Sequence, residues 1–308
     1  MKRAVYRGLF AAIALAWTAA AVHAQQDLDV GAQQALRAAE EAARIEAAWA
    51  ARMKAEAAKP TPRAADGRPD LNGNWGDQPR RVALRIEKSA DGKTIIVHDL
   101  DAPDLDVPTQ EGFRQRAADR ARRPPYKPQH VAKQRELMYT ASRVDPGLVC
   151  YPLGVPRLGA PTEIAQTPST VYFFYAGQRA HRIIPIGGKH PVDSDPFPEG
   201  DSVARWEGDT LVVEVVNIDP ETWLDGDGDF HSEELRVVER LTRKGNTLEY
   251  EVIIEDPQLL TAPWKPVADF SLDRIGGRTM VLREGAHDPG NYACLERDRD
   301  HKVNNDRF

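Results

Sequence analysis

The side chains best suited to chemistry lie in one acidic segment between two strand-like runs. Residues 223–233 read WLDGDGDFHSE, which places Asp225 and Asp229 close in sequence to His231. A carboxylate beside a histidine orients the imidazole and makes it more basic, an arrangement common in acid–base catalysis. We therefore predict an acid–base site in which His231 transfers a proton and Asp225 is its partner carboxylate.

Two other interpretations of this segment stay open. Asp225, Asp227 and Asp229 alternate as in a calcium-binding loop, so a divalent metal is an alternative to a site without cofactor. The EF-hand pattern fails at its sixth position, which is Phe230 rather than glycine, and at its twelfth, which is Arg236 rather than glutamate. The plainest alternative is a solvated acidic loop.

Further candidate residues lie outside this segment. His190 precedes a proline in a glycine-rich loop, and we expect it to be a second acid or base. Tyr172 and Trp223 are expected to form the walls of a ligand cavity, with ordinary core packing as the alternative. Arg157 and Arg205 are expected to bind an anionic or carbonyl group of the ligand.

The elements that must position these residues are strands. The run 248–255 alternates Leu, Tyr, Val and Ile with Glu, Glu, Ile and Glu, and the run 235–241 alternates Leu, Val, Glu and Leu with Arg, Val and Arg. This period of two is typical of half-buried antiparallel strands. Gly208-Asp209 and Lys244-Gly245-Asn246 lie where hairpin turns are expected.

The pattern over the whole chain predicts a mainly β fold. Further hairpins are expected within 82–99, 171–186 and 270–283, which brings the total to about ten sequential strands. We predict a calycin-like antiparallel meander that closes into a barrel or a deep curved sheet, with an open sandwich as the alternative. Two short helices are expected over 111–123 and 130–142.

The start of the chain predicts export. Residues 1–24 combine Lys2, Arg3 and Arg7 with a short apolar core and a Val-His-Ala cleavage site, as in a secretory signal peptide. We expect a periplasmic or secreted protein with no membrane contact after cleavage. An uncleaved N-terminal anchor is the alternative.

The remaining chain divides into three predicted regions. An Ala-rich helix and linker occupy 25–67, a β-rich domain 68–296 and a charged tail 297–308. Ile45, Trp49 and Met53 form one narrow apolar stripe on the helix, which either lies on the domain or joins two chains as a homodimer.

Cysteine content and charge limit the partners. In an oxidising compartment Cys150 and Cys294 are expected to form a disulfide, which in the chain-entropy model stabilises the fold by about 4–5 kcal/mol. A reactive or metal-binding thiol is the alternative. The 41 basic and 47 acidic residues show no electrostatic footprint for nucleic acid, and no P-loop or GxGxxG sequence predicts a nucleotide.

Several motifs together resemble one protein family. They are RPDLNGNW (68–75), CYPLGVPR (150–157), QTP (166–168), GDSVARWEGDTLVVEVVNID (200–219), TWLDGDGDFHSEELRVVERL (222–241) and TLEYEVIIEDP (247–257). They are similar to landmarks of a family of exported, mostly uncharacterised proteins of proteobacteria and acidobacteria. The resemblance implies a shared β-rich fold and export, and it implies no catalytic residues.

These observations lead to one functional expectation and two alternatives. We expect an exported protein that binds a partly apolar or aromatic small molecule and acts on it by acid–base chemistry, as a lyase, isomerase or hydrolase. A non-catalytic periplasmic protein that binds a ligand or metal is the first alternative. An interaction module displayed by the Ala-rich helix is the second.

Overall fold

The computed structural model describes residue 44 and residues 47–76, 84–88, 95–99, 123–175, 180–266 and 278–283. The predicted signal peptide, the charged tail, Cys294 and all but Arg123 of the helix predicted over 111–123 lie outside these residues. The chain forms two compact units, one with residues 1–51 and 81–112 and the other with 52–80 and 113–308. In the first unit β2 (Leu84–Lys88) and β3 (Ile95–Asp99) form the predicted antiparallel hairpin.

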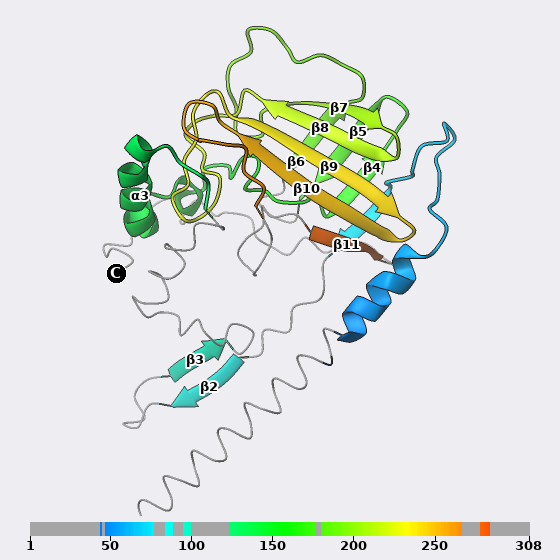
Figure 1. Cartoon of the computed structure of the whole chain (residues 1–308), viewed down its shortest axis with the longest axis horizontal. Coiled ribbons are helices and arrows are strands. Elements are labelled where there is room, and N and C mark those ends of the chain that lie inside the picture. The colour runs from blue at the N-terminus through cyan, green and yellow to red at the C-terminus, as the bar shows by residue number, and fades with distance from the viewer. Residues whose placement is uncertain are drawn as a thin grey trace, which may run out of the picture. The chain divides into compact units, whose positions relative to one another are not determined.

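The second unit contains a nine-stranded antiparallel sheet that is nearly closed into a barrel (Figure 1). Strands β1, β4, β5 and β6 pair in chain order, as do β7 to β11, and β11 returns to pair with β1, so that β6 and β7 are the two end strands of the sheet. The predicted mainly β antiparallel meander is therefore confirmed, and it is nearly closed into a barrel. The strands are β1 (Gly73–Gly76), β4 (Glu163–Gln166), β5 (Thr170–Phe174), β6 (His181–Pro185), β7 (Asp201–Glu207), β8 (Thr210–Val216), β9 (Arg236–Lys244), β10 (Thr247–Glu255) and β11 (Arg278–Arg283).

One junction of the sheet differs from all the others. Around a ring of nine strands directions cannot alternate throughout, so the last pair, β6 and β7, must run parallel. A parallel bridge joins Ile186 to Ala204, and the Gly187 N–H donates to the Ala204 carbonyl at 2.7 Å. Parallel neighbours need a long connection, and the segment 186–200 supplies it. We call this junction of β6, β7 and their bridge the seam.

The barrel interior is mostly apolar, because the side chains that point inward at alternate positions of the strands are mainly aliphatic and aromatic. On β10, Leu248, Tyr250, Val252 and Ile254 are all buried, whereas Glu251 between them is exposed. Fully buried aliphatic and aromatic side chains each contribute about 1.5–3 kcal/mol by leaving water. The largest of them on the strands are Trp75, Tyr250, Phe173, Ile164, Ile184, Leu211, Leu241 and Leu248.

The Ala-rich helix ends against the predicted turn between β9 and β10. Residues 47–57 are helical, with Trp49 and Met53 half-buried, and Ile45 lies outside the described residues. The Asn246 N–H donates to the Glu56 carbonyl at 3.0 Å. At Gly245 φ is +55°, and a Cβ there would lie 2.3 Å from the Glu56 carbonyl oxygen, so this turn requires glycine. The homodimer through this helix stays a prediction.

The described helices of the second unit are short. α3 (Val131–Val144) confirms the helix predicted over 130–142, and the single turns η1 (Pro128–His130) and η2 (Pro146–Val149) flank it. No helix in the described part of the chain is long and apolar enough to cross a membrane.

Candidate functional site

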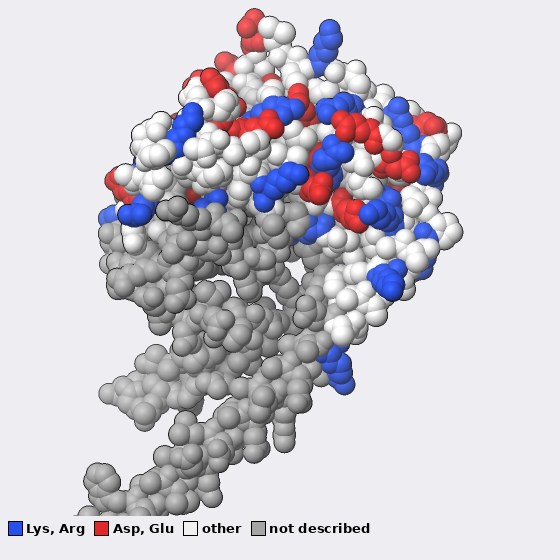
Figure 2. Space-filling model, in the orientation of Figure 1, with Lys and Arg blue, Asp and Glu red and all other residues white. Residues whose placement is uncertain are grey.

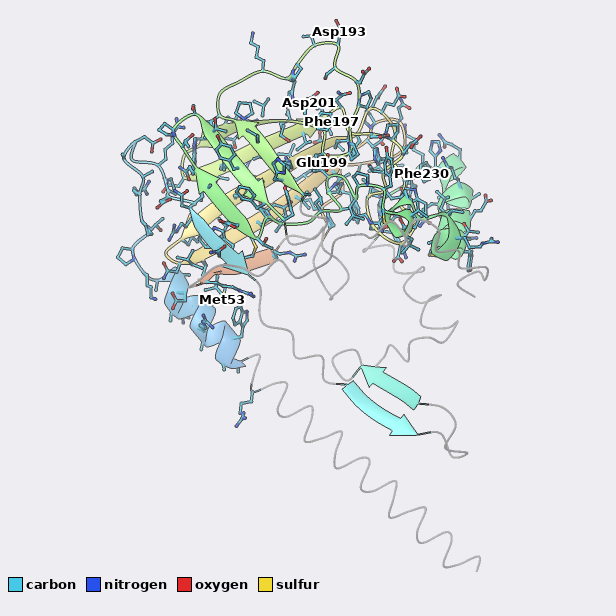
Figure 3. All side chains as sticks on the ribbon, turned by 180° about the vertical axis from the view of Figure 1, so that it is seen from behind. Met53, Asp193, Phe197, Glu199, Asp201 and Phe230 are labelled. Atoms are coloured by element: carbon cyan, nitrogen blue, oxygen red, sulfur yellow. The ribbon has the colours of Figure 1, made fainter. Side chains whose placement is uncertain are left out.

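The acidic segment between β8 and β9 packs on α3. At Gly228 φ is +80°, and a Cβ there would lie 2.6 Å from the backbone of Leu137 and Met138. The next aromatic residue, Phe230, stacks on Tyr126 with ring centroids 5.2 Å apart, and Figure 3 shows it beside the helix. The segment is therefore held against the protein rather than extended into solvent.

Arg123 supplies a positive charge to the three aspartates. Its guanidinium lies 3.2 Å from Asp227 and 3.3 Å from Asp229, while Asp225 accepts the backbone N–H of Asp227 at 2.8 Å. Burial, and then the charge of Asp225, raise the pKa of Asp229 well above its ordinary value. Within the described residues no group of three or more metal-ligating side chains is arranged to hold a metal ion.

His231 is buried and bonded on both sides of its ring. Nδ1 lies 2.9 Å from the Ser232 carbonyl, which only accepts, so Nδ1 carries a proton, and Nε2 lies 2.8 Å from the Thr222 hydroxyl, which also lies 2.8 Å from the Asp219 carbonyl. Burial lowers the pKa of His231 and favours the neutral ring. The structure thus pairs His231 with Thr222 and Ser232 rather than with Asp225, a geometry that favours a structural role.

Three other predicted residues also lie in structural settings. Both terminal nitrogens of Arg157 donate to Asp145 at 2.7 Å. Trp223 packs in the apolar core, and Tyr172 lies on the outer face of β5, between the inward-facing Val171 and Phe173. The groove on the outer side of the seam is lined by none of these three residues and not by His231.

A groove opens on the outer side of the seam. It encloses about 350 Å³, which is within the lower part of the range for small-molecule sites. It is lined by Gly187, Gly188, Lys189, His190, Val203, Ala204, Arg205 and Glu214. Two predicted site residues, His190 and Arg205, are therefore brought together here. We call it the seam groove. Figure 3 labels Asp193, Phe197 and Glu199 in the segment that connects β6 to β7.

His190 and Glu214 form a histidine–carboxylate pair in the seam groove. His190 Nε2 lies 3.1 Å from Glu214 Oε1. Because a carboxylate only accepts, the proton of the neutral ring is on Nε2, which leaves a lone pair on Nδ1. This Nδ1 is buried and has no hydrogen-bond partner among the described residues.

Glu214 is kept ionised by its neighbours. Burial alone would raise its pKa, but the hydrogen bonds and charges of Arg236 and His190 outweigh burial and lower it. Arg236 donates Nε to Glu214 at 2.9 Å and also pairs with Glu255 at 2.5 Å. A charged carboxylate is therefore present to orient the imidazole and to stabilise its protonated form.

Cationic side chains border the seam groove. Arg205 donates Nε and Nη2 to one oxygen of Glu207, and Arg240 binds the other oxygen at 2.9 Å. Figure 2 shows acidic and basic side chains interleaved over the outer face of the sheet. Lys189 makes no ion pair with the described residues.

Sequence reasoning missed a polar cluster inside the barrel. Arg182 Nη1 lies 2.7 Å from Glu239 and 2.9 Å from the Tyr175 hydroxyl, and the Tyr250 hydroxyl donates to Glu239 at 2.8 Å. Arg182 Nη2 also donates to Ser202 at 2.7 Å, which ties β6 to β7 across the seam. The available signal was the glutamate on the otherwise apolar face of the run 235–241.

Cys150 ends η2 in the left-handed conformation, with φ of 65°. Its predicted partner, Cys294, lies outside the described residues, so the disulfide stays a prediction.

The described residues thus form a nine-stranded antiparallel meander, nearly closed into a barrel, with a groove at the parallel bridge between Ile186 and Ala204. Comparisons with protein-family models, curated proteins and solved structures find no match. The resemblance of the motifs to a family of exported bacterial proteins therefore stays a prediction.

Proposed function

We propose that this chain is an exported protein that binds a small molecule in the seam groove, with His190 as the residue that moves a proton. The observation that carries the proposal is the buried Nδ1 of His190, which has no hydrogen-bond partner in the described part of the chain, while Nε2 lies against Glu214. A buried acceptor without a donor is costly, and a bound molecule with an O–H or N–H group would satisfy it.

The same geometry supports acid–base chemistry. Nδ1 would take a proton from the bound molecule, and the imidazolium that forms would be stabilised by Glu214 at 3.1 Å. The negative charge left on the ligand would lie near Lys189 and Arg205, which also line the groove. Such a proton transfer is the step expected of a lyase, an isomerase or a hydrolase.

Binding without turnover is the second candidate function. It needs only the hydrogen bond that the unpartnered Nδ1 of His190 can accept, whereas a general base must in addition remove the proton. A ligand-binding protein needs only one hydrogen bond at this atom.

The test is an NMR screen of a small-molecule library against the protein and two variants. His190→Gln removes the candidate base, and His181→Gln changes an exposed histidine on β6 as a matched control. We expect compounds that move the His190 ring signals of the parent protein to bind the His181→Gln variant normally and the His190→Gln variant weakly. Conversion of a bound compound, lost in His190→Gln and Glu214→Gln, would identify an enzyme. Hits that bind all variants equally would refute the site.

A further inference from the structure

The charges around the seam groove do not balance. The groove and the ion pairs that extend from it contain four cationic side chains and three carboxylates. The cations are Lys189, Arg205, Arg236 and Arg240, and the carboxylates are Glu207, Glu214 and Glu255. Lys189 is the cation that has no carboxylate partner among the described residues. Elsewhere on the outer face the cations are paired, as Lys244 is with Glu249 at 2.7 Å. A negative charge added close to Lys189 in the groove would therefore be stabilised.

Arg205 can take part in holding such a charge. Its Nε and Nη2 both bind one Glu207 oxygen, at 3.0 and 2.7 Å, and the other oxygen is bound by Arg240. Its Nη1 makes no hydrogen bond with the described residues. A guanidinium edge and an ammonium group in one groove match the oxygens of a carboxylate.

The rest of the lining is apolar and open. Val203 and Ala204 form one wall, and a Cβ at Gly188 would lie 3.5 Å from Pro185. A Cβ at Gly187 would meet nothing within 4 Å. Beyond Pro185 on the same face of β6, Ile183 is 61% exposed. These surfaces suit the apolar body of a small ligand, while His190 Nδ1 requires a hydrogen-bond donor.

Resting on the proposed function, we infer that the ligand is a small organic anion with an apolar body and a hydroxyl or amino group. Its carboxylate lies between Lys189 and Arg205, its body covers Val203, and its donor group points to His190 Nδ1.

The experiment compares 3- and 4-hydroxybenzoate with the matching neutral hydroxybenzamides and with benzoate. Binding is measured by NMR through the His190 ring signals, and by calorimetry. We expect the hydroxybenzoates to bind most tightly, benzoate to bind more weakly, and the amides to bind at least tenfold more weakly than the acids. Added salt should weaken only the acids.

Lysine variants separate the contribution of the groove from general surface charge. Lys189→Met should weaken hydroxybenzoate binding about tenfold, whereas Lys244→Met, which removes a paired lysine on the same outer face, should not change it. If amides and acids bind equally and Lys189→Met has no effect, the anionic ligand is refuted while the proposed function stands. If no probe of either kind moves the His190 signals, the inferred ligand is refuted, and the library screen with His190→Gln decides the proposed function separately.

Discussion

The buried pair of Arg182 and Glu239 offers the sharpest test of how the barrel is held closed. Their side chains are 3% and 1% exposed and lie 2.7 Å apart. Burial alone would lower the pKa of Arg182, but the charge of Glu239 outweighs burial and raises it above the ordinary value. Replacement of Arg182 by Met leaves the Glu239 carboxylate buried, with the Tyr250 hydroxyl as its one remaining side-chain donor among the described residues.

The expected cost is large. Removal of one partner from a buried ion pair typically costs about 3–5 kcal/mol, because an uncompensated charge stays in the interior. Arg182→Met also removes both hydrogen bonds to Ser202, which join β6 and β7. The double variant Arg182→Met/Glu239→Gln should recover part of the loss, because no unpaired charge then remains.

Urea unfolding of the mature chain, followed by circular dichroism, measures these differences as shifts of the midpoint at constant slope. Arg240→Met is the matched control, since Arg240 neighbours Glu239 on the same strand but pairs with Glu207 on the solvated outer face. That surface pair should contribute little. Equal losses for Arg182→Met and Arg240→Met, or a double variant less stable than Arg182→Met alone, would contradict the assigned role of the buried pair.

Three further predictions concern the acidic segment and the turns. Burial lowers the pKa of His231 in the folded protein, so the unfolded chain binds a proton at this residue more readily. The stability of the fold should therefore fall as pH drops below about 6.5. In urea unfolding at several pH values, His231→Gln should reduce this pH dependence. The pKa of Asp229 is raised in the folded protein, so the stability of the fold should fall as pH rises above about 4. Relative to the parent protein, Asp229→Asn should therefore be more stable at pH 7 than at pH 4. A difference between variant and parent that is the same at both pH values would contradict this prediction. Gly245→Ala should lower stability by at least about 1 kcal/mol more than Gly208→Ala. Both glycines have a positive φ, but of the two only Gly245 lies against the end of the Ala-rich helix. Equal melting temperatures of the two variants would argue against that contact.

The candidate site shows how far residue patterns reach. The association of histidine with a carboxylate was a sound chemical expectation, yet in sequence it favoured His231, which has aspartates within a few residues. In the structure it is His190 that lines an exposed groove and pairs with a carboxylate, that of Glu214 on β8. Strand pairing brings together residues that are far apart along the chain. Spacing in the sequence therefore does not reveal the pair of His190 and Glu214.

Two short strands explain why closure was harder to predict than the strands themselves. The runs 235–241 and 248–255 alternate clearly, and both became long central strands, β9 and β10. β1 and β4 have only four residues each, GNWG and EIAQ, too few to show a period. Their presence sets the number of strands in the ring.

The sequence by itself determined that the chain builds antiparallel hairpins with one apolar face, because alternation depends on each residue and its near neighbours. Only the tertiary structure decided which two strands are the ends of the sheet and face each other. Because the number of strands is odd, these two strands, β6 and β7, are parallel and need the long segment that connects them. That junction carries the groove, His190 and the interior bond from Arg182 to Ser202. Its position depends on the count of all strands together, a property that no single stretch of residues contains.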